Sequence, residues 1–259
     1  MGNSLRWPGI AGARLREGTL PFHHYHTLGD SLLMDFSHNF FAVSDSSPKS
    51  PAASGSFLFK FSQVLDEFSS FDPGTTYRLD FLTKLKRGLT RKAEALLTSI
   101  PYGENCTFTG ILIIRTGSGT KGILFHTGDS LLFQVAHKIK KIEELTKKNF
   151  LLVGRTSHFF QVEEIDILPE ALLIITTDGF CDLEYQNYRE RNNLIIGLAR
   201  SHAVEELPDK ILENIDSPKN IVDDIGIISL CPERMTLSKE KIVLTGSSSY
   251  PAKQGKIKL

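Results

Sequence analysis

The chain has 259 residues and a mass of 28.9 kDa, which is enough for one large domain or two small ones with a buried core. Hydrophobic residues make up 41% and charged residues 23%, a composition that excludes a disordered or fibrous protein. Thirty Lys and Arg balance thirty Asp and Glu, so the chain lacks the basic surplus of proteins that bind nucleic acid or anionic membranes. No apolar run approaches the ~20 residues of a membrane helix.

The first hundred residues predict two strands followed by two helices. Residues 1–21 carry Gly, Arg and Pro without a clear period, and we interpret them as a loose lead-in with at most one edge strand. Residues 31–45 predict two strands around a polar turn, and the breaker-rich run SSPKSPAASGS follows. Helical periodicity then predicts helices over 57–68 and about 75–98.

The rest of the chain is rich in short strand-like runs. The apolar stretch 171–177 is continuous, which is typical of a strand covered on both faces. The polar run 138–148 is interpreted as a short helix, 184–215 has a helical pattern with breaks, and residues after Pro232 are expected to fray. The expected strands are 106–115, 122–126, 131–135, 159–167, 171–177 and 225–231.

This order of elements favours an α+β fold. Helices come in blocks between runs of strands instead of alternating with single strands. Two packed antiparallel β-sheets flanked by helices accommodate that order. We expect one domain over residues 1–235, which begins with the lead-in 1–21, and a C-terminal tail over 236–259.

The cysteines and the first residues indicate a reducing compartment. Cys106, Cys181 and Cys231 are odd in number and none lies at CxxC spacing, so they predict neither a disulfide framework nor a zinc site. Residues 1–18 lack the apolar middle of a signal peptide, and Arg6 departs from the myristoylation pattern. We therefore expect a cytoplasmic location.

Three aspartates share one sequence context. Asp45 and Asp178 each end a buried apolar run, and Asp223 precedes another. Asp30 and Asp129 are further candidates, each within a Gly-Asp-Ser sequence. Carboxylates at strand ends can converge on one edge of a sheet, where Mg²⁺ or Mn²⁺ takes oxygen ligands. A single Asp after a strand is more often a turn residue, so each position alone is also compatible with a turn.

Four longer segments surround these aspartates, in the order FFAVSDSSPKSPAASGSF, CTFTGILIIRTGSGTKGILFHTGDSLLFQV, ALLIITTDGFCDL and NIVDDIGIISL. In this order they resemble the metal-dependent protein phosphatase family, the type 2C protein phosphatases. The first resembles that family's strand, Asp-Gly and helix-opening segment, and the second its central hairpin. The third resembles its strand ending in Asp-Gly, and the fourth its last core segment. Each is weakly specific alone, but together they cover most of residues 27–231.

The resemblance implies a role for each of these residues. It implies that Asp45 bridges two metal ions and that the backbone carbonyl of Ser46 is a ligand. Asp178 and Asp223 complete the first metal site, and Asp129 with Asp178 helps to hold an optional third ion. The implied catalytic residues are Asp45, Asp178 and Asp223, and the implied metal ligands are Asp30, Asp45, Ser46, Asp129, Asp178 and Asp223.

The same resemblance implies a signalling hydrolase, a protein serine/threonine phosphatase. The implied reaction is hydrolysis of phosphoserine or phosphothreonine in a protein by a metal-bound hydroxide, with two or three Mn²⁺ or Mg²⁺ ions. A phosphorylated protein is the implied partner, and neither nucleic acid nor membrane is expected. The oligomeric state is left open.

Four positions depart from the family's pattern. Gly29-Asp30 stands where most members have Glu-Asp, which removes the carboxylate that usually holds the second metal. The sporulation and stress-response branch also has Gly-Asp there, and its Asp serves the metal. Tyr25 replaces the usual phosphate-binding Arg, Ser46 replaces a Gly and Gly226 replaces a Thr. These departures favour the alternative of a pseudophosphatase, which keeps the fold and binds a partner without turnover.

Two further clusters each have a plain interpretation and a functional one. His23, His24 and His26 precede Asp30, and they fit a surface strand, a metal site or a protonated substitute for the missing Arg. Basic residues on the second predicted helix fit either a solvated face or a docking surface for an acidic or phosphorylated partner. They are Lys84, Lys86, Arg87, Arg91 and Lys92.

Overall fold

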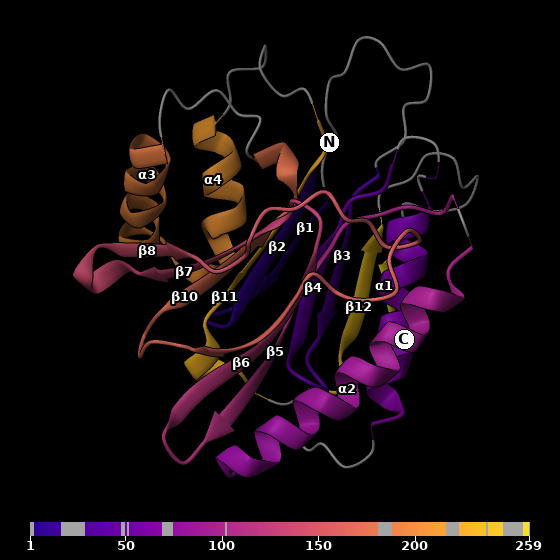
Figure 1. Ribbon diagram of the computed structural model, residues 1–259. Helices are drawn as coiled ribbons and strands as arrows, with labels where there is room; N and C mark the ends of the chain where they lie inside the picture. The colour runs from indigo at the N-terminus through magenta and orange to yellow at the C-terminus, as the bar shows by residue number, and fades with distance from the viewer. Residues whose placement is uncertain are drawn as a thin grey trace.

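The computed structural model describes residues 3–16, 29–47, 50, 52–68, 75–101, 103–180, 188–215, 223–236, 238–245 and 256–258. The described strands form two antiparallel sheets that pack face to face (Figure 1). The six-stranded sheet has the order β1 (Asn3–Trp7), β2 (Ala11–Arg16), β11 (Ile225–Leu230), β10 (Leu172–Thr176), β7 (Leu131–Ala136) and β8 (Lys141–Glu144). The seven-stranded sheet has the order β13 (Lys256–Lys258), β12 (Lys241–Thr245), β3 (Ser31–Asp35), β4 (Phe40–Ser44), β5 (Phe108–Thr116), β6 (Gly119–Thr127) and β9 (Gln161–Asp166).

Two pairs of helices cover the outer faces of this sandwich (Figure 1). α1 (Ala53–Asp66) and α2 (Leu79–Ser99) pack on the seven-stranded sheet. α3 (Tyr188–Ser201) and α4 (Leu207–Ile215) pack on the six-stranded sheet. None of the described helices is long and apolar enough to span a membrane. The expected fold class, an α+β sandwich of two antiparallel sheets flanked by helices, is confirmed.

Alternate residues of the central strands belong to different cores. Phe41 and Val43 of β4 face the opposite sheet, whereas Phe40 and Ala42 face the helices α1 and α2. β10 is divided in the same way between the core shared by the two sheets and the core under α3 and α4. The apolar sequence of β10 is continuous because both faces of the strand are buried, as the sequence predicts.

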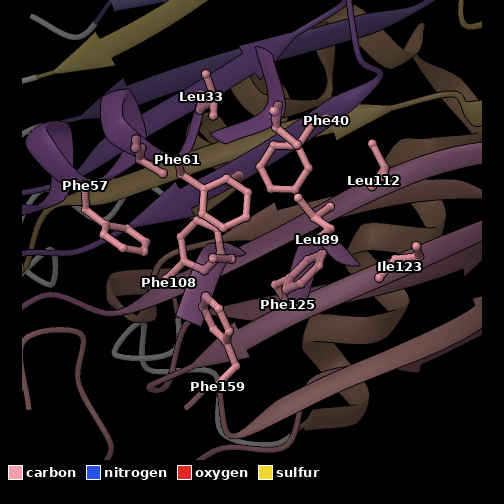
Figure 2. Packing of buried hydrophobic residues seen from close by; sticks show 14 of the residues in the cluster. Leu33, Phe40, Phe57, Phe61, Leu89, Phe108, Leu112, Ile123, Phe125 and Phe159 are labelled. Atoms are coloured by element: carbon pink, nitrogen blue, oxygen red, sulfur yellow. The ribbon is translucent and has the colours of Figure 1, made fainter. Parts of the chain in front are cut away.

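Aromatic rings join α1 to the seven-stranded sheet. Phe61 of α1 stacks on Phe40 of β4 with ring centroids 4.9 Å apart, and it lies 4.8 Å from the ring of Phe108 of β5. Figure 2 shows these rings together with Phe57 and Phe125 in one cluster. Full burial of each such side chain stabilises the fold by about 1.5–3 kcal/mol.

Within the expected lead-in 1–21, residues 3–16 form two strands and are not loose. β1 and β2 form a hairpin, and β2 lies inside the six-stranded sheet between β1 and β11. Ala11, Ala13 and Leu15 of β2 face the shared core, and two of these three are small, which weakens the apolar pattern in the sequence. Arg6 of β1 donates a hydrogen bond of 2.6 Å to Asp209 of α4, which fastens the hairpin to the helix layer.

The segment after Pro232 is not frayed throughout. Lys241–Thr245 forms β12, which pairs with β3 inside the seven-stranded sheet. Val243 packs under α1 and α2, and Ile242 and Leu244 face the shared core. These five residues are therefore part of the sheet rather than of a tail.

Residues 138–148 do not form the expected helix. A short 3-10 helix, His137–Ile139, is followed by Lys140 in the left-handed region at φ 54°, and the edge strand β8 then begins. The polar sequence reflects the exposed edge of the sheet and not a helix face. The two predicted long helices are present, but α1 begins at Ala53 and α2 at Leu79.

Candidate metal centre

The candidate site lies where strand ends from both sheets meet. β4 ends where its antiparallel neighbour β3 begins, so Asp30 and Asp45 lie at the same end of the seven-stranded sheet. β10 ends where its antiparallel neighbour β11 begins, which brings Asp178 to the same end of the six-stranded sheet as Asp223 and Asp224. Antiparallel pairing thus collects carboxylates that are far apart in the sequence.

Asp30 and Asp45 form the buried centre of this site. Asp30 is 1% exposed, and its carboxyl group hydrogen-bonds to that of Asp45. Burial raises the pKa of Asp30 well above its usual range, and the charges of Asp224 and Asp178 raise it further. Burial likewise raises the pKa of Asp45, and the charges of Asp30, Asp178 and Asp223 add to the effect. The carboxylates of Asp178, Asp223 and Asp224 therefore each lie close enough to repel Asp30 or Asp45.

A threonine that the sequence analysis did not single out holds Asp30 in position. The hydroxyl group of Thr177 donates a hydrogen bond of 2.7 Å to Asp30 Oδ2. The same hydroxyl oxygen accepts a bond of 2.8 Å from the backbone N–H of Gly226. Gly226 replaces the family's usual Thr, and a Cβ atom at this position would lie 2.7 Å from Leu32 Cδ2. Gly226 has no hydroxyl group, and the hydroxyl that contacts Asp30 in this chain is that of Thr177.

Gly29 is held by three hydrogen bonds around the site. Its N–H donates to Asp224 Oδ2 at 2.8 Å, and its carbonyl oxygen accepts from Ser54 Oγ at 2.6 Å and from the Ser46 N–H at 3.2 Å. A Cβ atom at Gly29 would lie 3.0 Å from the Ser46 carbonyl oxygen and 3.3 Å from Asp45 Oδ1. The absence of a side chain therefore lets the backbone approach Asp45 and Ser46 closely.

Ser46 is buried, and its hydroxyl oxygen accepts a bond of 2.7 Å from the Ser54 N–H in the first turn of α1. This bond satisfies one of the free N–H groups at the helix start. Among the described non-glycine residues, positive φ occurs only at Asn39, Lys140 and Glu170. The Ser46 backbone therefore avoids the left-handed region, as a Ser in place of Gly requires.

Asp129 lies in the turn between β6 and β7, and its neighbours are bonded to the segment that supports Asp45. Thr107 Oγ1 accepts a bond of 3.0 Å from the Asp45 N–H and lies 2.8 Å from Ser130 Oγ. Gly128 has φ +107°, and a Cβ atom there would lie 2.6 Å from Thr107 Cβ. The glycine is therefore required both by its φ and by the close packing of this turn on Thr107.

No family model matches the chain, and no curated protein matches it. Several solved structures do match. The PPM Ser-Thr phosphatase MsPP of Mycobacterium smegmatis, solved with cacodylate, has a TM-score of 0.60 and 17% identity over 85% of this chain and 97% of its own. The catalytic domain of the phosphatase PstP, solved with two manganese ions, has a TM-score of 0.61 and 15% identity over 85% and 96%. The SiaA-PP2C domain of Pseudomonas aeruginosa has a TM-score of 0.58 and 13% identity over 86% and 85%.

The chain has the type 2C protein phosphatase fold. All of these identities are low, so the likeness is one of architecture. The two sheets, the helix layers and the order of the four recognised segments agree with it. The sporulation and stress-response branch, which the Gly29-Asp30 pair suggests, stays a prediction.

The residues of this phosphatase-fold site fit a hard divalent cation. The donors are carboxylates and one backbone carbonyl, which are the ligands that Mg²⁺ and Mn²⁺ prefer. Burial and then repulsion from neighbouring carboxylates raise the pKa of Asp30 and of Asp45, and a bound cation would offset that repulsion. Within the described parts of the chain, no three His, Cys, Asp or Glu side chains are already arranged as a metal site. Asp30 and Asp45 hydrogen-bond to each other, so a cation that contacts both carboxylates would displace the proton between them.

Several of the predicted features lie outside the described residues. They are His23, His24, Tyr25, His26 and Cys181. The interpretations of the histidine cluster and of the substituted arginine therefore stay predictions.

The basic residues of α2 include two that form ion pairs with neighbouring elements. Lys86 lies 2.9 Å from Glu164 of β9, and Lys92 lies 3.2 Å from Glu67 just after α1. Both pairs are partly exposed, which is typical of a solvated helix face. Of the described cysteines, Cys106 and Cys231 are buried thiols, and burial raises the pKa of Cys106 to about 12.

Proposed function

We propose that the chain is a protein serine/threonine phosphatase that depends on Mn²⁺ or Mg²⁺. The observation that supports this most strongly is the group of buried aspartates at the strand ends of both sheets, where burial and neighbouring negative charges raise the pKa of Asp30 and Asp45. The fold shared with solved phosphatases supports the same proposal. The proposed substrates are phosphoserine and phosphothreonine in proteins.

The proposed ligands are divided between two principal ions. Asp45, Asp178 and Asp223 would hold the first ion. Asp45 would also contact the second ion, together with Asp30 and the backbone carbonyl of Ser46. Asp45 is suited to both because the charges of Asp30, Asp178 and Asp223 all act on it.

When bound, such ions polarise a phosphate ester and lower the pKa of water. The chain's own residues hold the ligands in place. Thr177 orients the Asp30 carboxylate, and Asp224 anchors the Gly29 N–H beside it. Thr107 supports the Asp45 backbone and reaches the turn that carries Asp129, the ligand that we propose for a third ion together with Asp178.

A pseudophosphatase is the alternative that a specific feature favours. Gly29 provides no carboxylate where the family usually has Glu, and a Cβ atom at this position would lie 3.0 Å from the Ser46 carbonyl oxygen. The second ion would then rest on fewer charged ligands. Such a protein would bind one metal ion or none and would hold a partner without turnover.

Metal binding and turnover can be measured separately. MnCl₂ is titrated calorimetrically into the wild type, Asp178→Asn and the control Asp80→Asn, whose side chain is 64% exposed on α2. Phosphate release from a phosphothreonine peptide is measured on the same three proteins. We expect binding and turnover in the wild type and the control, and a loss on the order of a hundredfold in Asp178→Asn.

Two results would decide against this function in different ways. Equal, negligible heats in all three proteins would exclude the metal site and the phosphatase with it. Metal binding by the wild type without release of phosphate would identify a pseudophosphatase.

A further inference from the structure

Three of the five exposed large apolar side chains among the described residues belong to one loop, residues 147–160 between β8 and β9. Phe150 is 88% exposed, Leu151 45% and Phe160 47%. Single exposed apolar residues are ordinary, but Phe150 and Leu151 are adjacent in the chain, and neighbouring exposed apolar side chains favour an interaction surface.

The exposure of Phe150 does not result from a loosely held loop. The neighbouring residue Asn149 is buried, and its side-chain oxygen accepts bonds from the Gly128 N–H at 2.9 Å and from the Leu151 N–H at 3.0 Å. The Asn149 N–H donates to the Gly128 carbonyl at 3.0 Å, and its Nδ2 lies 3.2 Å from Nε2 of the buried His126. The backbone on both sides of Phe150 is therefore fixed while the ring points away from the core.

Asn149 and Val153 attach the loop to two segments that support the candidate metal centre. Gly128, which bonds to Asn149, directly precedes Asp129. Val153 donates a backbone bond of 2.9 Å to Cys106, the residue before Thr107. Loop 147–160 is thus bonded to the turn of Asp129 and to Cys106, which lies before β5 and pairs with Ser46.

The loop is also positively charged within a neutral chain. Residues 147–160 contain Lys147, Lys148 and Arg155 and no acidic residue. Lys147 forms an ion pair of 2.5 Å with Glu163, whereas Lys148 and Arg155 are exposed cations that precede Phe150 and follow Leu151 in the chain. A segment that carries a phosphate group and an apolar side chain is complementary to this surface in both respects.

We infer that loop 147–160 docks the substrate polypeptide beside its phosphorylated residue. The inference rests on the proposed phosphatase function and deepens it by naming a preferred substrate class. This class has a large apolar side chain near the phosphoresidue, which covers Phe150 and Leu151, within an anionic segment that faces Lys148 and Arg155. An aromatic side chain on a held backbone suits this role because only its own torsions lose freedom when it is covered.

The test compares two phosphothreonine peptides that differ only in flanking residues, Leu and Phe in one and Ser in the other. kcat/KM is measured for both with the wild type, Phe150→Ala and the control Ile139→Ala. Ile139 is 69% exposed on the 3-10 helix before β8 and lies outside the loop. We expect the wild type to prefer the apolar peptide, and Phe150→Ala to lower that preference about tenfold. Ile139→Ala should retain the preference for the apolar peptide, and Lys148→Glu should lower kcat/KM for both peptides.

A preference that is absent in the wild type, or unchanged in Phe150→Ala, overturns the inference. Failure of the proposed function is recognised separately, because a wild type that hydrolyses neither the peptides nor p-nitrophenyl phosphate with Mn²⁺ is not a phosphatase. In that case fluorescence anisotropy of the labelled apolar phosphopeptide decides the docking role. Binding that Phe150→Ala weakens about tenfold supports the surface, and equal binding by the two proteins overturns it.

Discussion

Thr177 is not a proposed metal ligand, but it orients Asp30, which is. Its hydroxyl group is at once the donor to Asp30 Oδ2 and the acceptor for the Gly226 N–H. Asp30, Thr177 and Gly226 are all buried, so water cannot replace either bond. The loss of a partner from a buried polar group costs about 1–3 kcal/mol.

Thr177→Val keeps the shape of the side chain and removes both bonds. We expect the free energy of unfolding to fall by about 1–3 kcal/mol and the Mn²⁺ concentration for half-saturation to rise, because Asp30 is no longer oriented. Urea unfolding and calorimetric titration measure the two effects. The control is Thr176→Val, since the Thr176 hydroxyl is also buried but donates to the Thr177 carbonyl and not to Asp30. Equal Mn²⁺ affinities in the two variants would contradict the positioning role.

The sequence predicts the acidic residues of the site better than the residues that hold them. Asp45 and Asp178 are conspicuous because a carboxylate directly after a buried strand stands out against the apolar run. Thr177 and Ser54 carry no such signal, because hydroxyl residues are ordinary at strand ends and helix starts. Their roles depend on contacts between segments that are 147 and 25 residues apart.

At the scale of elements, β12 connects the C-terminal part of the chain to β3, the strand that follows Asp30. Lys241 of β12 lies 3.2 Å from Asp35 of β3 and 2.6 Å from Asp66 of α1. Asp35 is completely buried, and burial alone would raise the pKa of its carboxyl group. Hydrogen bonds and charge from His38, a bond from Ser37 and the charge of Lys241 outweigh burial and lower that pKa.

Lys241→Ala should therefore destabilise the protein strongly. The variant leaves a buried carboxylate with one cation fewer, and breaking a buried ion pair costs about 3–5 kcal/mol. Urea unfolding at pH 7 measures this loss, and Lys239→Ala, at an exposed position nearby, should change stability by less than about 0.5 kcal/mol.

The dependence on pH provides a second readout for the same variant. Because the folded-state pKa of Asp35 is lowered, its contribution to stability is complete above the unfolded value of 3.8 and is lost as the pH falls through the lower folded value. The wild type should show this acid loss, and Lys241→Ala should show less of it. If Lys241→Ala is as stable as Lys239→Ala at pH 7, the pair of Lys241 and Asp35 does not stabilise the fold.

The elements that the sequence predicts correctly are those with strong apolar patterns. β10 and β11 are buried on both faces, and α2 has leucines at helical spacing on one face. β2 and β8 escape prediction for opposite reasons. β2 packs small residues against the other sheet, whereas β8 is an exposed edge strand with a polar sequence. β12 is short, and its pairing with β3 joins residues about two hundred positions apart, which no local pattern reports.

At the scale of the whole molecule, the two sheets meet at the candidate metal centre as well as in the apolar core. β3 and β4 bring Asp30 and Asp45 from one sheet, and β10 and β11 bring Asp178 and Asp223 from the other. The resemblance of four segments predicts this convergence. The order of strands within each sheet does not follow from those segments, because it depends on β2 and β12.

The aspartates proposed to bind the metal also lower the stability of the metal-free fold. Buried like charges disfavour the folded state, and burial together with the charges of Asp30, Asp178 and Asp223 raises the pKa of Asp45. Asp45→Asn removes one charge from this group. We therefore expect the metal-free variant to melt about 2–4 °C above the metal-free wild type, the change that ~1 kcal/mol produces in a domain of this size.

Mn²⁺ should reverse that order. A cation that binds the folded chain alone stabilises it by about 2.7 kcal/mol at a hundred times its Kd, and Asp45→Asn lacks the carboxylate proposed to contact both ions. Differential scanning calorimetry in EDTA and in MnCl₂ measures both effects. Asp166→Asn, at an exposed position on β9, should keep the full gain of the wild type with Mn²⁺. A gain in Asp45→Asn as large as that of Asp166→Asn would show that the ion binds without Asp45, and it would overturn the contact with both ions that we propose for this carboxylate.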